Sequence, residues 1–282
     1  MVPAAVAQAV DRYLAVADRL LPGRITGFHL VGSVALGAWR PASSDIDFVA
    51  VTRDALGTGE SRRLRLLHPI GNWTAVSRAV ARRTPAIPGT VNGVFVAAGD
   101  LATPVTRIRP VAAHTGRRFH LGRAFDVNPV VWRILLDRGI TVRGRVPGEL
   151  GLDPEPAVLS RWNMDNLNGY WRSWAGRARA RKRQPIARRR SVDDAVSWGV
   201  LGSSRLHRTI ATGEIVSKED AGEYALDVFA SRWRPLIRAA LAYRRGEPAP
   251  TSPGQALSDP VSRLRLTGEF VEEVIADASR LG

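Results

Sequence analysis

Residues 29–51, HLVGSVALGAWRPASSDIDFVAV, decide how this chain folds. One apolar run ends at a Gly-Ser turn, and a second apolar run follows an Asp-x-Asp pair. Apolar runs of this length predict two buried strands. Because residues i and i+2 of a strand point to the same face, Asp45 and Asp47 are expected to lie side by side.

Two carboxylates on one side of a strand repel each other unless a cation lies between them. Oxygen-only ligands favour magnesium, so Asp45 and Asp47 are the candidate metal ligands and catalytic residues. Gly32 and Ser33, at the strand-to-helix turn, offer backbone N–H groups and a hydroxyl to phosphates. Together these features predict nucleotidyl transfer by metal-assisted, in-line attack. The alternative is a surface Asp-x-Asp pair beside an unrelated glycine turn.

This segment resembles the nucleotidyltransferase superfamily related to DNA polymerase β, whose mark is Gly-Ser, a short helix, and Asp-x-Asp on the next strand. Six positions match that pattern in order and spacing: Gly32, Ser33, Gly37, Ser44, Asp45 and Asp47. The resemblance implies that the two aspartates hold Mg²⁺ on the phosphates of ATP. It also implies that Gly32, Ser33 and Ser44 contact the nucleotide.

The composition is that of a globular protein. The 282 residues suit two modest domains, and the hydrophobic content of 45% is ordinary. No apolar run approaches the ~20 residues of a membrane span, and the N-terminus lacks the pattern of a signal peptide. Without cysteine, thiolate metal sites and disulfides are excluded. We expect a cytoplasmic protein without membrane contact and, with no obvious dimer seam, a monomer.

The net charge of +15 favours acidic partners. Only Lys182 and Lys218 are lysines, which leaves 39 of the 41 basic residues as arginine (41 − 2). That bias is typical of a GC-rich genome, so nucleic-acid binding is the less favoured interpretation. The arginine-rich stretch 177–190 predicts a solvated loop held extended by charge repulsion, with a nucleic-acid or acidic-partner contact as the alternative.

The order of the predicted elements indicates an α+β protein with two domains. Residues 1–150 predict a nucleotidyltransferase domain with a mixed sheet, and residues 151–282 predict an all-α helical bundle. The boundary is placed in the segment 146–157, which is rich in Pro, Gly and acid. The other predicted elements are helices at 3–21, 59–83 (interrupted), 128–137, 158–175, 192–211, 218–229, 233–245 and 261–280, and strands at 89–98 and 138–144.

A second constellation lies at residues 205–220, RLHRTIATGEIVSKED. Thr212-Gly213 predicts a helix stop, and Ser217 begins a capping box for the next helix. Lys218 then occupies the first helical position, where the helix dipole already favours an anion. The plain alternative for Lys218 is a solvated lysine at a helix start.

Residues 211–226 and 232–243 are similar to the C-terminal helical domain of bacterial streptomycin/spectinomycin adenylyltransferases. The resemblance implies that Arg205, Lys218 and Tyr243 contact the nucleotide. It also implies transfer of AMP from ATP to a hydroxyl of an aminoglycoside or aminocyclitol, an antibiotic-resistance activity.

The sequence departs from that family in two features. Active members carry a third carboxylate on a later strand as general base, and Asn92 falls at its place here. An amide cannot accept a proton near neutral pH, so a catalytically impaired nucleotide-binding protein is the alternative function. Asp100 and Asp126 are possible substitutes, although both are more simply ordinary turn residues.

The second departure concerns the acceptor pocket. The acidic and histidine positions that line the family's aminoglycoside site fall near Ala195 and Trp198. A chain with a net charge of +15 and without those acids is a poor host for a polycation. The alternative is that Asp165, Asp193 and Asp194 form a local acidic patch.

Overall fold

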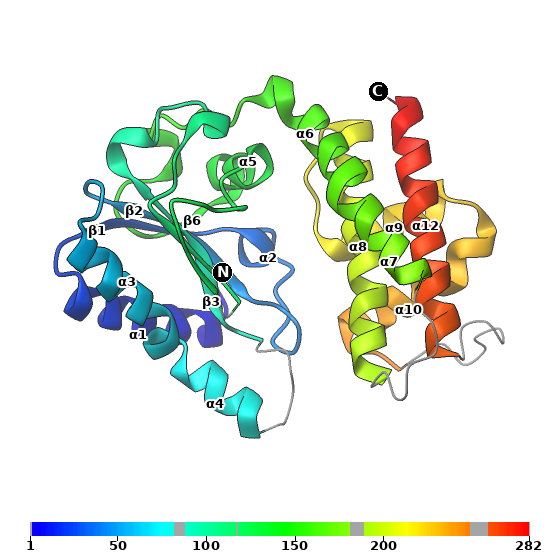
Figure 1. Cartoon of the computed structure of the whole chain (residues 1–282), viewed down its shortest axis with the longest axis horizontal. Coiled ribbons are helices and arrows are strands. Elements are labelled where there is room, and N and C mark those ends of the chain that lie inside the picture. Colours follow the sequence, from blue (N-terminus) through cyan, green and yellow to red (C-terminus); the bar gives the residue numbers. More distant parts are fainter. Residues whose placement is uncertain (1, 82–87, 117, 181–188, 249–258, 282) are drawn as a thin grey trace. The chain divides into compact units, whose positions relative to one another are not determined.

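The computed structural model describes residues 2–81, 88–116, 118–180, 189–248 and 259–281. The chain divides into two compact units, Met1–Pro156 and Ala157–Gly282 (Figure 1). Residues just beyond 150 belong to the first unit, since Val105 N–H donates to the Asp153 carbonyl at 3.1 Å and Thr106 N–H donates to Glu155 at 2.7 Å. These bonds tie the acidic segment back onto the loop after the third strand.

The N-terminal unit is built on one mixed sheet of six strands in the order β5-β4-β3-β2-β1-β6. Only the β2–β3 pair is parallel. The strands are β1 (Ile25–Leu30), β2 (Ile46–Thr52), β3 (Val91–Ala97), β4 (Ala112–Thr115), β5 (Arg118–Leu121) and β6 (Ile140–Arg143). Figure 1 shows helices on both sides of this sheet.

One face of the sheet packs against α1 (Ala4–Leu20) and α3 (Thr58–Gly71). The strand residues on this face are aromatic and aliphatic, and Tyr13 of α1 contacts Phe28 and Phe48, which stack with ring centroids 4.6 Å apart. The stripe of α1 that reaches them is fully buried, as its 3.6-residue apolar period predicts. α5 (Pro129–Arg138) lies on the opposite side of the sheet (Figure 1).

Four strand ends meet at one edge of the sheet, which we call the acidic edge after Asp45 and Asp47. β1 ends here, with Leu30 opposite both Phe48 of β2 and Ile140 of β6. β3 begins here as well, since β2 and β3 run parallel from Ile46 and Val91. The four-residue helix α2 (Gly32–Ala35) leaves β1 at the same edge.

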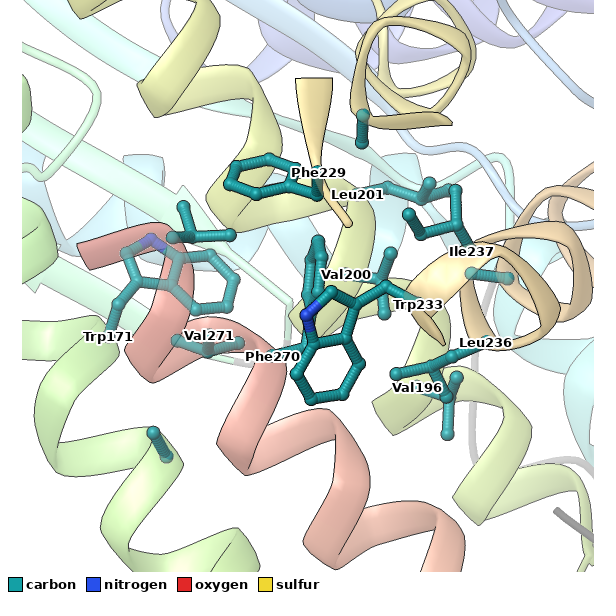
Figure 2. Close-up of a cluster of buried hydrophobic side chains, with 14 of the residues drawn as sticks. Trp171, Val196, Val200, Leu201, Phe229, Trp233, Leu236, Ile237, Phe270 and Val271 are labelled. Atoms are coloured by element: carbon teal, nitrogen blue, oxygen red, sulfur yellow. The ribbon is translucent and has the colours of Figure 1, made fainter. Parts of the chain in front are cut away.

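The second unit is all-helical in the residues described. Its helices are α6 (Leu159–Asn166), η5 (Leu167–Trp171, a π-helical turn), α7 (Arg172–Arg179), α8 (Arg189–Thr212), α9 (Lys218–Val228), α10 (Arg234–Arg245) and α12 (Pro260–Leu281). α8 packs against α9, α10 and α12. Figure 2 shows the core that they share, in which Trp171, Trp233 and Phe270 surround the small side chains of α8 and α12.

The predicted fold class is confirmed, with two local corrections. The interrupted helix predicted at 59–83 is two helices, α3 and α4 (Trp73–Ala81), which part at Asn72. Strands β4 and β5 had no prediction. Asp45 precedes the strand that starts at Ile46, so only Asp47 is a strand residue. Among the described residues, none of the helices is both long and apolar enough to cross a bilayer.

Candidate active site

The acidic edge brings Asp45, Asp47 and Asn92 together. Asp47 and Asn92 are direct neighbours in the parallel β2–β3 register, so their side chains leave the same face of the sheet. The Asn92 amide donates from Nδ2 to Oδ2 of Asp45 at 3.0 Å. Asp45 is exposed and Asp47 is half-buried. The site therefore presents two carboxylates to solvent, with an amide behind them.

The turn between β1 and α2 is shaped around Asp47. Gly32 has φ +58°, and a Cβ added there would lie 2.2 Å from Oδ2 of Asp47. The backbone fixes the same contact, because Val31 N–H donates to the Asp47 carbonyl at 2.9 Å. Only glycine satisfies both the positive φ and this close approach. α2 has four residues, so any help it gives a phosphate comes from its N-terminal N–H groups and Ser33 rather than from a long helix dipole.

Asn92 is 7% exposed, and its Oδ1 has no hydrogen-bond partner among the described residues. The donor set at the acidic edge is thus two carboxylates and one amide oxygen. No cluster of three or more His, Asp or Glu side chains that could hold a metal occurs in the part of the chain that the structure describes. Two carboxylates with substrate phosphates are an ordinary magnesium site, so these residues fit Mg²⁺.

Neither of the two possible substitutes for the missing carboxylate lies at this edge. Asp100 lies in the 3-10 turn after the far end of β3, and the strand from Asn92 to Ala97 alone spans roughly 17 Å. Asp126 precedes α5, and the C-terminus of α5 is the end next to the acidic edge, because only Gly139 separates it from β6. Asp126 lies at the other end of α5, and the ten residues of this helix span about 15 Å, which separates Asp126 from the acidic edge. Burial raises the pKa of Asp126, which is the ordinary result of desolvation.

Ser44 shapes the loop before Asp45. Its hydroxyl accepts a hydrogen bond from Arg40 N–H at 2.9 Å, and its own N–H donates to the Arg40 carbonyl at 2.8 Å. Ser44 is 4% exposed. Gly37, with φ +70° and no atom within 4 Å of an added Cβ, begins this loop in a left-handed conformation. The nucleotide contact expected of Ser44 stays a prediction.

In the helical unit, the three residues expected to bind nucleotide gather along α8. Arg205 lies on α8 and donates from Nε to the Val216 carbonyl at 3.0 Å, which fixes the loop before α9. Lys218 reaches the ring of Trp198, and Tyr243 reaches Asp194. Asp194, Trp198 and Arg205 are spaced i, i+4 and i+11, close to three helical turns, and so share one face.

Lys218 and Trp198 form a cation–π pair. Nζ of Lys218 lies 4.7 Å from the centroid of the Trp198 ring, and the Trp198 indole N–H donates to the Tyr170 hydroxyl at 3.0 Å. Trp171 lies against the same ring with centroids 5.7 Å apart. Tyr170 and Trp171 both belong to the π-helical turn η5, in which Tyr170 is exposed and Trp171 is buried. Ser217 caps α9 through the predicted capping box, with Asp220 at its third position.

The possible acidic patch is largely engaged by other side chains. Arg263, which is almost buried, pairs with Asp193 at 2.7 Å. The Tyr243 hydroxyl donates to Asp194 at 2.6 Å. Asp165 is exposed on α6. The structure therefore does not gather three acids into a site for a polycation, which agrees with the absence of acidic side chains at Ala195 and Trp198.

Most of the arginine-rich stretch 177–190 lies outside the described residues. Arg177 and Arg179 end α7, and Arg179 pairs with Glu272 of α12. Sequence reasoning missed Trp198, Tyr170 and Asp194 as neighbours of the residues that are expected to bind nucleotide. The available signal was the spacing of Asp194, Trp198 and Arg205 on one helix face.

Comparison with known proteins agrees with both units. Residues 11–77 match the model of the nucleotidyltransferase domain family, and residues 162–263 match the aminoglycoside adenylyltransferase C-terminal domain family. No curated protein sequence matches the chain. The crystal structure of spectinomycin adenyltransferase AAD(9) from Enterococcus faecialis with ATP and spectinomycin is similar, with a TM-score of 0.64 and 14% identity. The match covers 96% of this chain and 99% of that one.

The fold, the Gly32 turn and the two family matches define the class: the chain is a nucleotidyltransferase, an enzyme with a helical C-terminal domain. Within that class, it resembles the aminoglycoside adenylyltransferases. At 14% identity, the solved structure shows a shared fold.

Proposed function

We propose that the chain transfers AMP from ATP to a hydroxyl of a small molecule, in a magnesium-dependent reaction whose acceptor is of the aminoglycoside or aminocyclitol type. The observation that carries the proposal is the acidic edge, where Asp45 directly precedes β2, Asp47 lies in β2, and Gly32 of the turn before α2 leaves room for the Asp47 carboxylate. The acceptor class follows from the matched C-terminal domain family and from the spectinomycin and ATP of the similar structure.

Different residues of the chain would bind the metal, the phosphates and the rest of the nucleotide. Asp45 and Asp47 would hold Mg²⁺, which would neutralise charge on the phosphates and polarise the reacting phosphorus. Gly32 and Ser33 would bind the phosphate chain through backbone N–H groups and a hydroxyl. Arg205, Lys218 and Tyr243 of the helical unit would contact the nucleotide. Positioning and charge stabilisation supply most of the rate in reactions of this kind.

Calorimetric titration of ATP with magnesium tests the proposal directly. Wild type should bind ATP only when magnesium is present, and the Asp45→Asn/Asp47→Asn double variant should lose this binding. Asp100→Asn removes an acid at the other end of the same sheet and should bind like wild type. Binding that needs no magnesium, or that survives in the double variant, would refute the assigned site.

A second function is favoured by the hydrogen bond from Asn92 to Asp45, since an amide there provides no base. In that case the chain binds ATP with magnesium and transfers nothing. Pyrophosphate release measured over a panel of acceptors distinguishes the two functions. Turnover by wild type favours the transferase, whereas binding without turnover favours the nucleotide-binding homologue.

A further inference from the structure

Deprotonation of the acceptor is the step to which none of the described side chains of the acidic edge is assigned. A hydroxyl that attacks phosphorus must lose its proton, and a positioned base is worth roughly 10²–10⁴-fold in rate. Asp45 and Asp47 are assigned to the metal. Asn92, the third side chain at the edge, uses its Nδ2 to bind Asp45, and its buried Oδ1 can accept a hydrogen bond but not a proton.

Asp100, Asp126 and His29 of the N-terminal unit do not direct a titratable atom at the acidic edge. Asp100 and Asp126 lie toward the far end of the sheet, as described above. His29 shares the face of Asp47, because it pairs with Val49 in the β1–β2 register. However, its Nε2 lies 3.2 Å from the position of a Cβ added to Gly27, which places that nitrogen toward the far end of β1. His29 is also fully buried, and burial lowers its pKa.

The acids of the helical unit next to the expected nucleotide residues already have partners. Asp193 pairs with Arg263, and Asp194 accepts a hydrogen bond from the Tyr243 hydroxyl at 2.6 Å. His207 is 1% exposed and is bonded to both Tyr224 and Asp277, so it is enclosed among α8, α9 and α12. These groups serve to hold helices together.

We propose that the acceptor supplies its own base, and that the chain is selective for amino alcohols in which a basic amine adjoins the reacting hydroxyl. This inference rests on the proposed function. It names the acceptor chemistry that a site with Asn92 in place of a carboxylate can use.

The step balances within the bound substrates. The acceptor oxygen forms a bond to the α-phosphorus of ATP, and the bond from that phosphorus to the bridging oxygen breaks, releasing pyrophosphate. The hydroxyl proton moves to the neutral amine of the same acceptor, which leaves as an ammonium. A neutral amide at position 92 suits this arrangement, since a carboxylate there would favour the protonated amine and remove the base.

The test compares acceptors that differ only at the amine. Spectinomycin and streptomycin carry amines beside ring hydroxyls, and each is used with its amines free or acetylated. Pyrophosphate release is followed from pH 6 to pH 9, with acceptor affinity measured separately by calorimetry so that weaker binding is not mistaken for slower chemistry. Asn92→Glu supplies a base from the protein, and Asn92→Gln is the matched control that keeps an amide.

For wild type, acetylation should lower the rate at saturating acceptor by about 10²-fold or more, the usual worth of a base. The rate with the free amine should rise with pH through the amine pKa. Asn92→Glu should restore turnover of the acetylated acceptor and remove that pH dependence, whereas Asn92→Gln should not.

Equal rates for free and acetylated acceptors in wild type would overturn the inference while leaving the transferase function intact. Turnover by Asn92→Glu alone, with wild type inactive on every free-amine acceptor, would also overturn it and would support the nucleotide-binding alternative. Failure of both proteins to bind ATP with magnesium would instead refute the proposed function, and the inference with it.

Discussion

The acidic edge and the α8 face are built by different means. At the acidic edge, the backbone itself fixes the geometry, through the left-handed Gly32, the Val31–Asp47 hydrogen bond and the parallel β2–β3 register. Along α8, side chains from three helices are placed by contacts with one another, such as Lys218 on Trp198. A substitution in a site whose geometry the backbone fixes should have a large effect, whereas each side-chain pairing along α8 should contribute a small and separately measurable amount to ATP affinity. The predictions below test this difference, beginning with the largest effect.

Asp47→Asn should have the largest effect on transfer. The substitution removes a charge from the position that β2 and Gly32 hold in place, and loss of one preorganised electrostatic group typically costs about 10²–10³-fold in rate. Initial rates of pyrophosphate release measure the loss. Asp100→Asn, at the other end of the sheet, should leave the rate of pyrophosphate release unchanged. A substitution of this kind, away from the site, typically changes the free energy of unfolding by no more than roughly 0.5 kcal/mol. Comparable losses in both variants would contradict a localised site.

Gly32→Ala should disable the site and weaken the fold. A left-handed conformation costs a residue with a Cβ about 1–2 kcal/mol, and here the added Cβ would also lie 2.2 Å from Oδ2 of Asp47. Gly37→Ala is the matched control, because Gly37 also has a positive φ but no atom within 4 Å. Gly37→Ala should lower the free energy of unfolding by the cost of the left-handed backbone conformation alone, and it should still bind ATP. Urea unfolding and calorimetry separate the two terms, and equal effects would show that contact with Asp47 is unimportant.

The same contrast explains what could be predicted from sequence. The Gly-Ser turn, the Asp-x-Asp pair and the Ser217 capping box are local signals, and each one fixes backbone within a few residues. The partners of Lys218 and Tyr243 lie 20 and 49 residues away along the chain (218 − 198; 243 − 194). The helical spacing of Asp194, Trp198 and Arg205 predicts that these three share a face, but it does not identify the distant residues that contact them. β4 and β5 were missed because both are four residues long, and β5 is mostly exposed and lacks an apolar run.

Acid should destabilise the N-terminal unit before the helical unit. Burial lowers the pKa of His68, and burial together with the nearby His68 lowers that of His114 to about 2, so folding favours the neutral form of both side chains. The unfolded chain takes up these protons below about pH 6.5, so stability falls as the pH drops from there, by up to about 1.4 kcal/mol per pH unit for each histidine. His207 of the helical unit is partly compensated by Asp277.

Hydrogen exchange, corrected for intrinsic rates, measures the opening free energy of each unit between pH 7 and pH 5. His114→Gln should reduce the slope for the N-terminal unit, and replacement of the exposed His120 by Gln should leave it unchanged. A steeper acid loss in the helical unit would contradict the assignment. This pH dependence concerns stability alone. Its source is His114, which lies in the core under α1 and α3 and is hydrogen-bonded to the Tyr13 hydroxyl at 2.8 Å.

Trp198→Ala should have the smallest effect, a loss of ATP affinity of about two- to fivefold. A partly exposed cation–π contact is worth about 0.5–1 kcal/mol, and Trp198 is 43% exposed. Trp198→Phe keeps an aromatic face for Lys218 and should lose less. If Trp198 acts by orienting Lys218, the Trp198→Ala change should have no further effect in a Lys218→Ala background, a non-additivity that calorimetry of ATP binding can measure. Additive losses would mean that the ring contacts the ligand directly, and the α8 face would then be an aromatic surface for binding rather than a support for one lysine.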